Sequence, residues 1–303
     1  MEISYTHWIS AAFFRLSPRW NGCSKEYAAF ALGWLAHSET ICEFIISCGA
    51  IAPLVILVQS GTDDQKKQAA LALGNLTVDS TDSTAAIFVN QGAVPPLVAL
   101  VTGAIPHLVE VLRTGVPALL TLGYLGATNK TNSKVIREAG AFGLMLDLLR
   151  ADATELKENA VSAFEHLTAH NNDNLKTLAR EGIIALLISL LRTGTDVQKE
   201  PGASILGRLA STKPNRETIV DERAIPLLVE MLWTGTNDQK EEAASVLSRL
   251  AKENTSKEEI KVSGAIDALK DIQQMGTSNL KRKAGMALKT ISEGGEAGTK
   301  RRR

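Results

Sequence analysis

His166 and His170 are spaced in a way that can hold a metal ion. They lie four residues apart in a stretch with helical periodicity, which places both side chains on one predicted helix face. In the zinc-protease pattern a glutamate follows the first histidine directly, and Leu167 stands there instead. We therefore interpret the two histidines as a solvated or groove-lining pair, and the sequence predicts no metal site.

Two further stretches contain residue types used in nucleotide binding or catalysis. Gly123–Thr131 holds Gly, Lys and Thr without the spacing of a phosphate loop, and it follows a helix rather than a strand, so we expect an ordinary loop. Ser204 lies between Gly202 and Gly207, but these glycines are at the wrong offsets for a nucleophile elbow. The sequence therefore predicts no catalytic residue, no cofactor and no enzyme activity.

The composition gives no sign of nucleic-acid binding. Apolar residues make up 45% of the 303 residues and charged residues 22%, an ordinary balance for a soluble protein. Lysine plus arginine equals aspartate plus glutamate at 33 each, so no overall positive field attracts a polyanion. We expect no nucleic-acid partner, and any electrostatic recognition has to be local.

Cysteine usage and the lack of apolar spans indicate a cytoplasmic protein. Cys23, Cys42 and Cys48 are an odd number without the pairing of metal ligands, which suits a reducing compartment. No stretch approaches the roughly 20 apolar residues that a membrane helix needs. Residues 1–14 carry Glu2 where a signal peptide has basic residues. We therefore expect no membrane insertion.

The elements that must position these residues form an internal repeat, marked by a tetrad of the type Leu-Gly-x-Leu. The tetrads are Leu32–Leu35, Leu73–Leu76, Leu122–Leu125, Phe164–Leu167, Leu206–Leu209, Leu247–Leu250 and Leu288–Ile291. Five of the six intervals are 41 or 42 residues, as in repeats built from short helices. Each tetrad ends one helix, and a short helix, a turn and a longer apolar helix follow. Such repeats have to stack to bury their apolar faces.

Turn and cap residues recur with the same period. A glycine opens the second helix of most repeats, where a Cβ would obstruct the chain reversal. These glycines are Gly49, Gly92, Gly140, Gly182 and Gly264. Arg223 replaces glycine in one repeat, so that turn has to form without glycine's freedom. Third helices begin with a threonine that can accept hydrogen bonds from free backbone amides. These starts are Thr62–Lys67, Thr195–Glu200 and Thr236–Glu241.

Two of these segments resemble armadillo repeats: the turn and second helix of Gly49–Val55, and the third helix of Gln65–Leu76. The resemblance covers about residues 24–291. It implies an all-α, right-handed α-α superhelix of about six or seven repeats, in which third helices line a concave groove. The pattern is similar to that of importin-alpha, beta-catenin and vacuolar armadillo proteins, and it does not single out a partner.

The repeat pattern divides the chain into three parts. Residues 1–23 are predicted to be a partial N-terminal capping repeat, residues 24–292 the armadillo solenoid, and residues 293–303 a disordered basic tail. The tail ends in Lys300–Arg303, which we interpret as a solvated terminus, with a short nuclear localisation signal as the alternative.

One interval breaks the period. Leu73 and Leu122 are 49 residues apart, where two repeats would span about 82, so roughly 33 residues are absent from a shortened repeat near residues 101–118. Gly92–Val101 is followed at once by a second copy of the same helix, Gly103–Leu112. Either a real junction changes the curvature or the sequence comes from a gene model that lost an exon. We expect this segment to show the least protection in hydrogen exchange.

The resemblance places partner-contacting side chains at two positions, four residues apart, on each third helix. In nuclear-import adaptors these positions hold tryptophan and then asparagine. Asn75 keeps the asparagine, and no tryptophan occupies the first position. The predicted partner-binding residues are Phe30, Trp34, Leu71, Asn75, Leu120, Tyr124, Ser162, His166, Ser204, Arg208, Ser245 and Arg249, followed by Met286 and Thr290.

This series is apolar and aromatic toward the N-terminus, whereas serine is paired with histidine or arginine toward the C-terminus. Lys281, Arg282 and Lys283 follow. Such a surface favours a partner with apolar anchors and with carboxylate or phosphate groups. Glutamates one helical turn earlier could pair with the basic residues, so salt-bridged, solvated helix faces are the alternative. These glutamates are Glu158, Glu200 and Glu241.

We therefore predict a non-enzymatic scaffold that binds a protein or peptide segment in the groove of an armadillo solenoid. We expect it in the cytoplasm, with access to the nucleus. One alternative is an importin-alpha-like nuclear transport adaptor. Another is an accessory repeat protein of a ubiquitin-ligase system, which would need an added domain for which this chain has no room.

Overall fold

The structure is a computed structural model of the chain. It describes residues 22–36, 39–78, 82–104, 116–127 and 130–292, together with the single positions 9, 12, 15 and 16. The chain forms two compact units, a first unit of Met1–Asn174 and a second unit of Leu175–Arg303.

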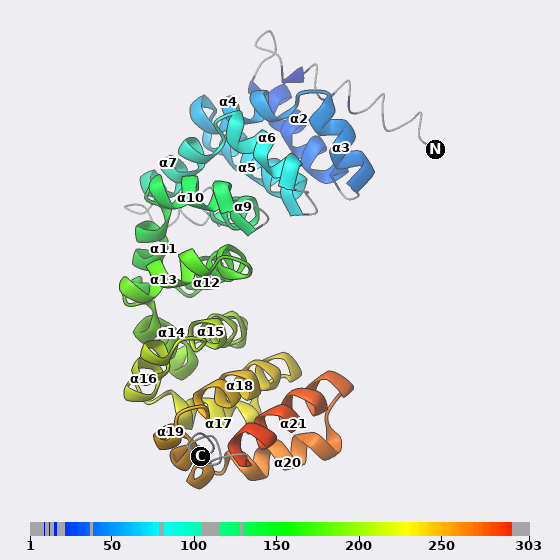
Figure 1. Cartoon of the computed structure of the whole chain (residues 1–303). Helices are drawn as coiled ribbons and strands as arrows, with labels where there is room; N and C mark the ends of the chain where they lie inside the picture. The colour runs from blue at the N-terminus through cyan, green and yellow to red at the C-terminus, as the bar shows by residue number, and fades with distance from the viewer. Residues whose placement is uncertain are drawn as a thin grey trace, which may run out of the picture. The chain divides into compact units, whose positions relative to one another are not determined.

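The described elements are α-helices that follow one another in repeats of three (Figure 1). The first helices are α3 (Glu39–Ser47), α6 (Asp82–Asn90), α10 (Lys130–Glu138), α13 (Asn172–Arg180), α16 (Lys213–Asp221) and α19 (Asn254–Val262). The second helices are α4 (Ile51–Ser60), α7 (Val94–Ala104), α11 (Ala141–Arg150), α14 (Ile183–Thr193), α17 (Ala224–Thr234) and α20 (Ala265–Met275). The third helices are α2 (Gly22–Leu35), α5 (Asp63–Val78), α9 (Val116–Ala127), α12 (Thr154–Thr168), α15 (Asp196–Leu209), α18 (Asn237–Leu250) and α21 (Ser278–Ser292).

The third helices α5, α15 and α18 begin at a capping threonine, as predicted for Thr62, Thr195 and Thr236. The backbone N–H of Gln239 donates to Thr236 Oγ1 at 3.3 Å, and the Thr236 N–H donates to Gln239 Oε1 at 3.1 Å. This reciprocal pair is a capping box, which satisfies amides that would otherwise lack a partner. Thr195 and Gln198 form the same box at the start of α15. The Thr-x-x-Gln spacing is thus a local signal that starts a third helix.

The turn that precedes a second helix uses the left-handed backbone conformation. Gly140 and Gly264 both have φ of 86°. Arg223 takes the place of glycine before α17 and still adopts φ of 62° and ψ of 41°. Because the left-handed region costs a residue with a Cβ about 1–2 kcal/mol, this turn forms without glycine at the expense of stability.

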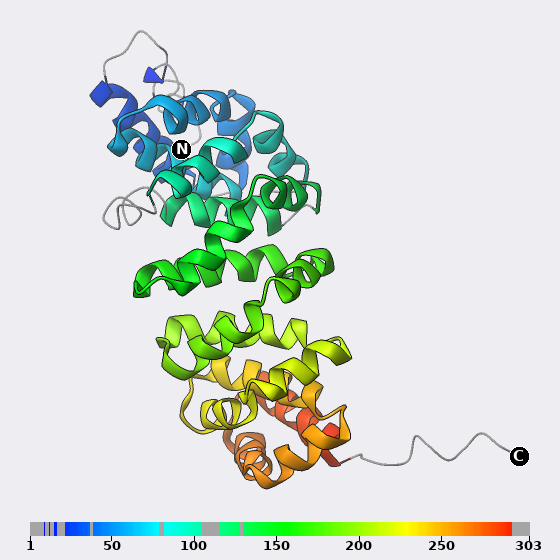
Figure 2. The ribbon, with the colours of Figure 1, turned by 90° about the vertical axis from the view of Figure 1, so that its left-hand side faces the viewer.

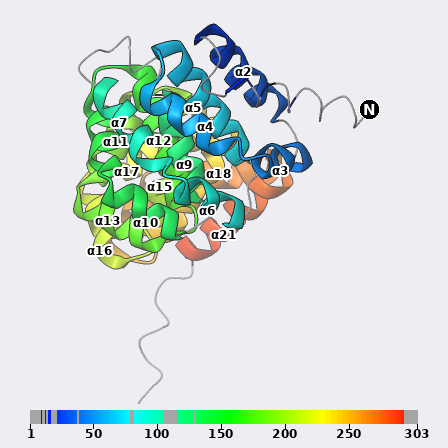
Figure 3. The ribbon, with the colours of Figure 1, turned by 90° about the horizontal axis from the view of Figure 1, so that it is seen from above.

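In the first unit the third helices stack directly on one another. α2 packs against α5, α5 against α9, and α9 against α12. Figure 3 shows α2 and α5 together from above. A Cβ on Gly33 would lie 3.1 Å from Ala72 Cα, and a Cβ on Gly123 would lie 3.0 Å from Ala163 Cα. The tetrad glycines Gly33 and Gly123 are therefore points of close backbone approach between third helices of the first unit.

The second unit stacks in the same way, with α15 against α18 and α18 against α21. Its second helices form a parallel row, because α14 packs against α17 and α17 against α20. Figure 2 shows the helices of this unit following one another in chain order, from yellow-green to red. Leu206, Leu228 and Leu247 are fully buried between these rows. Burial of each such side chain stabilises the fold by about 1.5–3 kcal/mol.

The irregular interval and both ends lie largely outside the described residues. α7 ends at Ala104 and α9 begins at Val116, so most of the second copy of the helix is not among them. On either side, α5 packs against α9 and α7 against α11. Near the N-terminus, Ile9, Ala12 and Leu16 are buried. The capping repeat, the shortened repeat and the basic tail therefore remain predictions.

By length and composition, no single helix among the described residues is able to cross a membrane. One helix pair, Thr40–Ser47 and Ile51–Ser60, meets the same criteria jointly, with a bend of 75° between its members. Leu54, Val55 and Leu57 of the second member are buried in the first unit.

Candidate protein-binding surface

Each third helix turns two side chains, four residues apart, away from the core. On α5, Leu71 and Asn75 are exposed, whereas Ala72, Leu73 and Gly74 between them are buried. The predicted partner-binding residues all lie at such positions, and none of them is buried. We name this surface the third-helix face. In the first unit it consists of Phe30, Trp34, Leu71, Asn75, Leu120, Tyr124, Ser162 and His166, and in the second unit of Ser204, Arg208, Ser245, Arg249, Met286 and Thr290.

The third-helix face of the first unit begins with an aromatic row. Tyr27, Phe30 and Trp34 of α2 are 67%, 54% and 70% exposed, and their spacing places them on one side of the helix. Leu71 of the neighbouring α5 is also exposed. Large apolar side chains gathered on adjacent helices are typical of an interaction site. Tyr27 was missing from the predicted set, although its three-residue spacing from Phe30 was a usable signal.

Two residues of the face also bind the backbone of the preceding third helix. Asn75 Nδ2 donates to the Gly33 carbonyl at 3.0 Å, and Arg249 Nη1 donates to the Gly207 carbonyl at 2.6 Å. In both cases the acceptor is a tetrad glycine 42 residues earlier. The side chain at the third tetrad position therefore links consecutive repeats as well as facing outward. This link was not predicted from the sequence, although the offset of 42 residues that both pairs share was a usable signal.

The His166 ring packs, tilted, against an aromatic ring of the adjacent repeat. The centroids of the His166 and Tyr124 rings are 4.7 Å apart, with 51° between the ring planes. α12 ends at Thr168, so His170 lies beyond the helix in a turn. The expectation that both histidines share a helix face is wrong, because Asn171 caps the next helix and the chain has already turned. Among the described residues, no group of three or more His, Cys, Asp or Glu side chains could hold a metal.

The other two stretches considered for chemistry are largely helical. Gly123 lies inside α9 and Lys130 begins α10, so the expected loop over Gly123–Thr131 is wrong. The close approach of α9 to α12 requires the glycine there, which is a packing reason rather than a loop signal. Ser204 lies within α15, where it accepts a hydrogen bond from Arg208 Nη2 at 2.8 Å.

On α15 and α18 of the second unit the third-helix face is polar and basic. Ser204 and Arg208 of α15 and Ser245 and Arg249 of α18 occupy matching positions one repeat apart, and all four are partly exposed. A guanidinium group can bind a carboxylate or a phosphate through two parallel hydrogen bonds. This part of the surface is suited chemically to acidic or phosphorylated groups.

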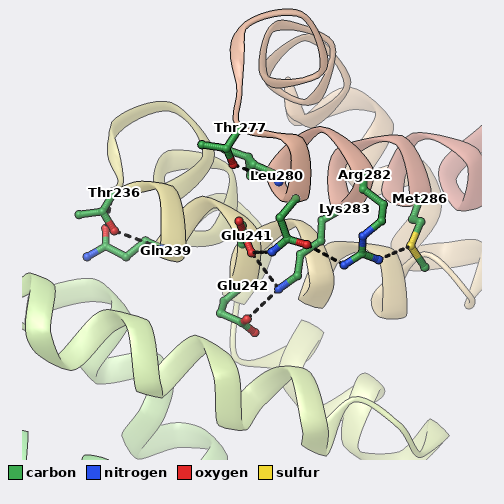
Figure 4. Close-up of polar contacts among 10 residues, drawn as sticks. Thr236, Gln239, Glu241, Glu242, Thr277, Leu280, Arg282, Lys283 and Met286 are labelled. Carbon is green, nitrogen blue, oxygen red and sulfur yellow. Dashed lines mark hydrogen bonds and ion pairs between the residues drawn. The ribbon is translucent and has the colours of Figure 1, made fainter.

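Charged side chains of α18 and α21 pair with each other across the two helices (Figure 4). Lys283 Nζ lies 3.0 Å from Glu242 Oε1 and 3.4 Å from Glu241 Oε2. Arg282 Nη2 donates to Asn279 Oδ1 at 2.7 Å. Glu241, one of the glutamates behind the alternative of salt-bridged helix faces, thus pairs with a basic residue, and Glu242, which was not considered, takes part as well.

Two family models match the sequence. The model described as the plant U-box protein ARM repeat region matches residues 109–270, more than half of the chain. The model described as the armadillo/beta-catenin-like repeat matches residues 41–78. The comparison with curated proteins gave no match.

Several solved structures share the fold. An engineered protein of the Northeast Structural Genomics Consortium has a TM-score of 0.72 at 23% identity, covering 80% of this chain and 99% of that one. Designed armadillo repeat protein YIII(Dq)4CqI has a TM-score of 0.71 at 21% identity, with 80% and 99% covered. Designed armadillo repeat protein YIII(Dq.V1)4CPAF, in complex with peptide (KR)4, has a TM-score of 0.69 at 20% identity, with 80% and 99% covered.

These likenesses confirm the predicted fold class, an all-α armadillo solenoid. At such low sequence identity, the solved structures are evidence for the fold only. The plant U-box family model is a match of the sequence, and it covers most of the repeats that hold the third-helix face. The chain therefore belongs to the armadillo repeat family, and within it to the group described as the ARM repeat region of plant U-box proteins.

Proposed function

We propose that this protein is a non-enzymatic scaffold that binds a segment of another protein, or a peptide, on its third-helix face. The observation that carries the proposal is the register of exposed side chains. In each unit the same two positions of every third helix stay at least partly exposed, while most of the residues between them are buried. Side chains at a regular spacing can contact successive residues of one partner segment.

Relatives of the same fold support this role. Armadillo repeat proteins are typically scaffolds rather than enzymes. A designed armadillo repeat protein is in complex with the peptide (KR)4, which supports the binding of a peptide by stacked repeats of this kind. The preference of the present chain has to follow from its own side chains, because they differ from those of the designed protein.

We propose that the two units recognise different chemistry. The first unit offers apolar side chains, and Phe30, Trp34 and Leu71 can take up apolar anchors of a partner. In the second unit, Arg208 and Arg249 can bind carboxylate or phosphate groups. The favoured partner therefore carries both apolar and acidic elements.

The acidic preference is tested with a fluorescent oligoglutamate peptide and anisotropy titrations. Arg208→Glu combined with Arg249→Glu should weaken binding by about 1–3 kcal/mol, or roughly 5- to 150-fold. Much of the difference should disappear at high salt, because exposed charges are screened. Unchanged affinity at low salt would reject the basic part of the surface.

A matched control separates local recognition from overall charge. Arg192→Glu with Lys270→Glu makes the same charge change on exposed residues of the second helices α14 and α20. This control should bind the peptide within about threefold of the wild type. Equal losses in both double variants would show a nonspecific charge effect. Thermal melts verify that loss of the Arg249–Gly207 hydrogen bond has not unfolded the second unit.

A role in ubiquitin ligation is a second candidate, favoured by the family match over residues 109–270. In this role the third-helix face holds either a ligase component or a protein to be modified. Direct titration of a purified plant U-box ligase domain tests the first possibility. If the double variant Arg208→Glu with Arg249→Glu binds this domain with the affinity of the wild type, the third-helix face has no role in the binding.

A further alternative is an importin-alpha-like adaptor. The residue types at the two exposed positions of the third helices count against it. Asn75 is the asparagine retained at the second position, and tryptophan is missing from the first. Tight binding of a basic nuclear-localisation peptide by the wild type would revive this alternative. We also propose a cytoplasmic location with access to the nucleus, which imaging of a fluorescent fusion tests.

A further inference from the structure

The sign of the charge reverses along the third helices of the second unit. One repeat of 41 residues separates Lys283 from Glu242 and Arg282 from Glu241. The last third helix, α21, therefore carries basic residues where α18 carries acidic ones. Because α18 packs against α21, this reversal brings opposite charges together at one level of the stack.

The Lys283 ammonium group lies between two carboxylates of α18, as Figure 4 shows. Its Nζ is 3.0 Å from Glu242 Oε1 and 3.4 Å from Glu241 Oε2. The side chain of Lys283 is 21% exposed, and those of Glu241 and Glu242 are 13% and 24% exposed. Groups this shielded from water attract each other more strongly than an ordinary surface pair and are screened less by salt.

The neighbouring cation, Arg282, is engaged elsewhere. Its Nη2 donates to Asn279 Oδ1 at 2.7 Å, and its Nη1 lies 3.5 Å from Met286 Sδ. Asn279 Nδ2 in turn donates to Glu241 Oε2. Within the part of the chain that the structure describes, Lys283 is the cation paired with both carboxylates.

We propose that Lys283 is a specificity-determining residue of the third-helix face, because it occupies both carboxylates from within the chain. A lysine or arginine of a partner is thereby kept from using them. This inference rests on the proposed function, and it explains how acidic residues beside the face coexist with a preference for acidic segments.

Removing the ammonium should open the carboxylate pair to a basic partner. Two variants of α21 make the same change in net charge: Lys283→Gln, and Lys281→Gln as the matched control. Lys281 is partly exposed and forms no ion pair with a described residue. Fluorescent oligoarginine and oligoglutamate peptides are titrated against each protein at low and at moderate salt.

We expect Lys283→Gln to bind oligoarginine about tenfold more tightly than the wild type, and Lys281→Gln to change this affinity by less than about threefold. Lys283→Arg, which keeps the charge, should behave as the wild type. Adding Glu241→Gln and Glu242→Gln to Lys283→Gln should abolish the gain. Lys283→Met provides a second neutral variant should the glutamine variant fold poorly.

Equal gains in Lys283→Gln and Lys281→Gln would overturn the inference, since net charge alone would then explain them. A gain that persists in the triple variant would overturn it as well. Failure of the wild type to bind oligoglutamate would instead count against the proposed acidic preference, and it would leave a selective gain in Lys283→Gln as support for the role of Lys283.

Discussion

Replacement of Gly123 by alanine tests whether the tetrad glycines set the spacing of the third helices. The new Cβ would lie 3.0 Å from Ala163 Cα and 3.4 Å from Ala163 O on the facing helix. Both are backbone atoms, so α9 and α12 have to move apart by a few tenths of an ångström. Such overpacking costs about 1–3 kcal/mol. Alanine recovers about 1 kcal/mol of helix propensity over glycine, so we expect a net destabilisation of about 1 kcal/mol.

Gly207→Ala provides the matched control on α15. A Cβ there would meet Val246 Cγ2 at 3.6 Å, an ordinary contact, so the helix propensity should dominate. This variant should be stabilised by about 0.5–1 kcal/mol. Urea unfolding followed by circular dichroism gives the shift in midpoint, and hydrogen exchange assigns it to a helix, because repeat proteins need not unfold in two states. Stabilisation of Gly123→Ala equal to that of Gly207→Ala would refute the reasoning.

Three further predictions concern single features of the units. Arg223→Gly relieves the left-handed strain before α17 and should stabilise the second unit by about 0.5–1 kcal/mol, so a lower melting temperature would contradict it. Glu253→Gln weakens the nearly buried pair in which Arg216 Nη2 lies 2.6 Å from Glu253 Oε1, and it should cost about 2 kcal/mol in urea unfolding. The exposed pair Lys213–Glu217 is the control, and Glu217→Gln should cost less than about 0.5 kcal/mol. Phe30→Ala with Trp34→Ala should change the unfolding free energy by less than about 1 kcal/mol, because both side chains are largely exposed; a larger loss would place them in the core.

The fold could be predicted from the sequence because its signals are local and repeat. Thr236 and Gln239 cap a helix through neighbours three residues apart, and Gly140 permits a turn through its own backbone. Arg223 shows the strength of the surrounding packing, since the turn keeps its left-handed form without glycine. Because these signals return in every repeat, equivalent positions of the third helices could be identified from the sequence. The positions predicted to face outward are exposed or partly exposed in the structure.

The contacts between repeats were harder to predict, because they depend on distances that a periodic pattern does not contain. The hydrogen bonds of Asn75 and Arg249 to glycine carbonyls require two helices at a specific separation. His170 was misplaced because the end of α12 depends on where Asn171 caps the next helix. The pairing of Lys283 with Glu242 needed both the register and the direction of the side chains.

The most direct test of binding by the third-helix face starts from a random peptide library selected on the wild-type protein. The affinity of each selected peptide is measured for Arg208→Glu/Arg249→Glu and Phe30→Ala/Trp34→Ala, and for control variants on other faces, Arg192→Glu/Lys270→Glu and Ile56→Ala. We predict a loss of about tenfold or more in at least one face variant, and changes within about threefold in both controls. The proposed binding surface would be contradicted if the selected peptides bound both face variants with wild-type affinity and bound a control variant more weakly.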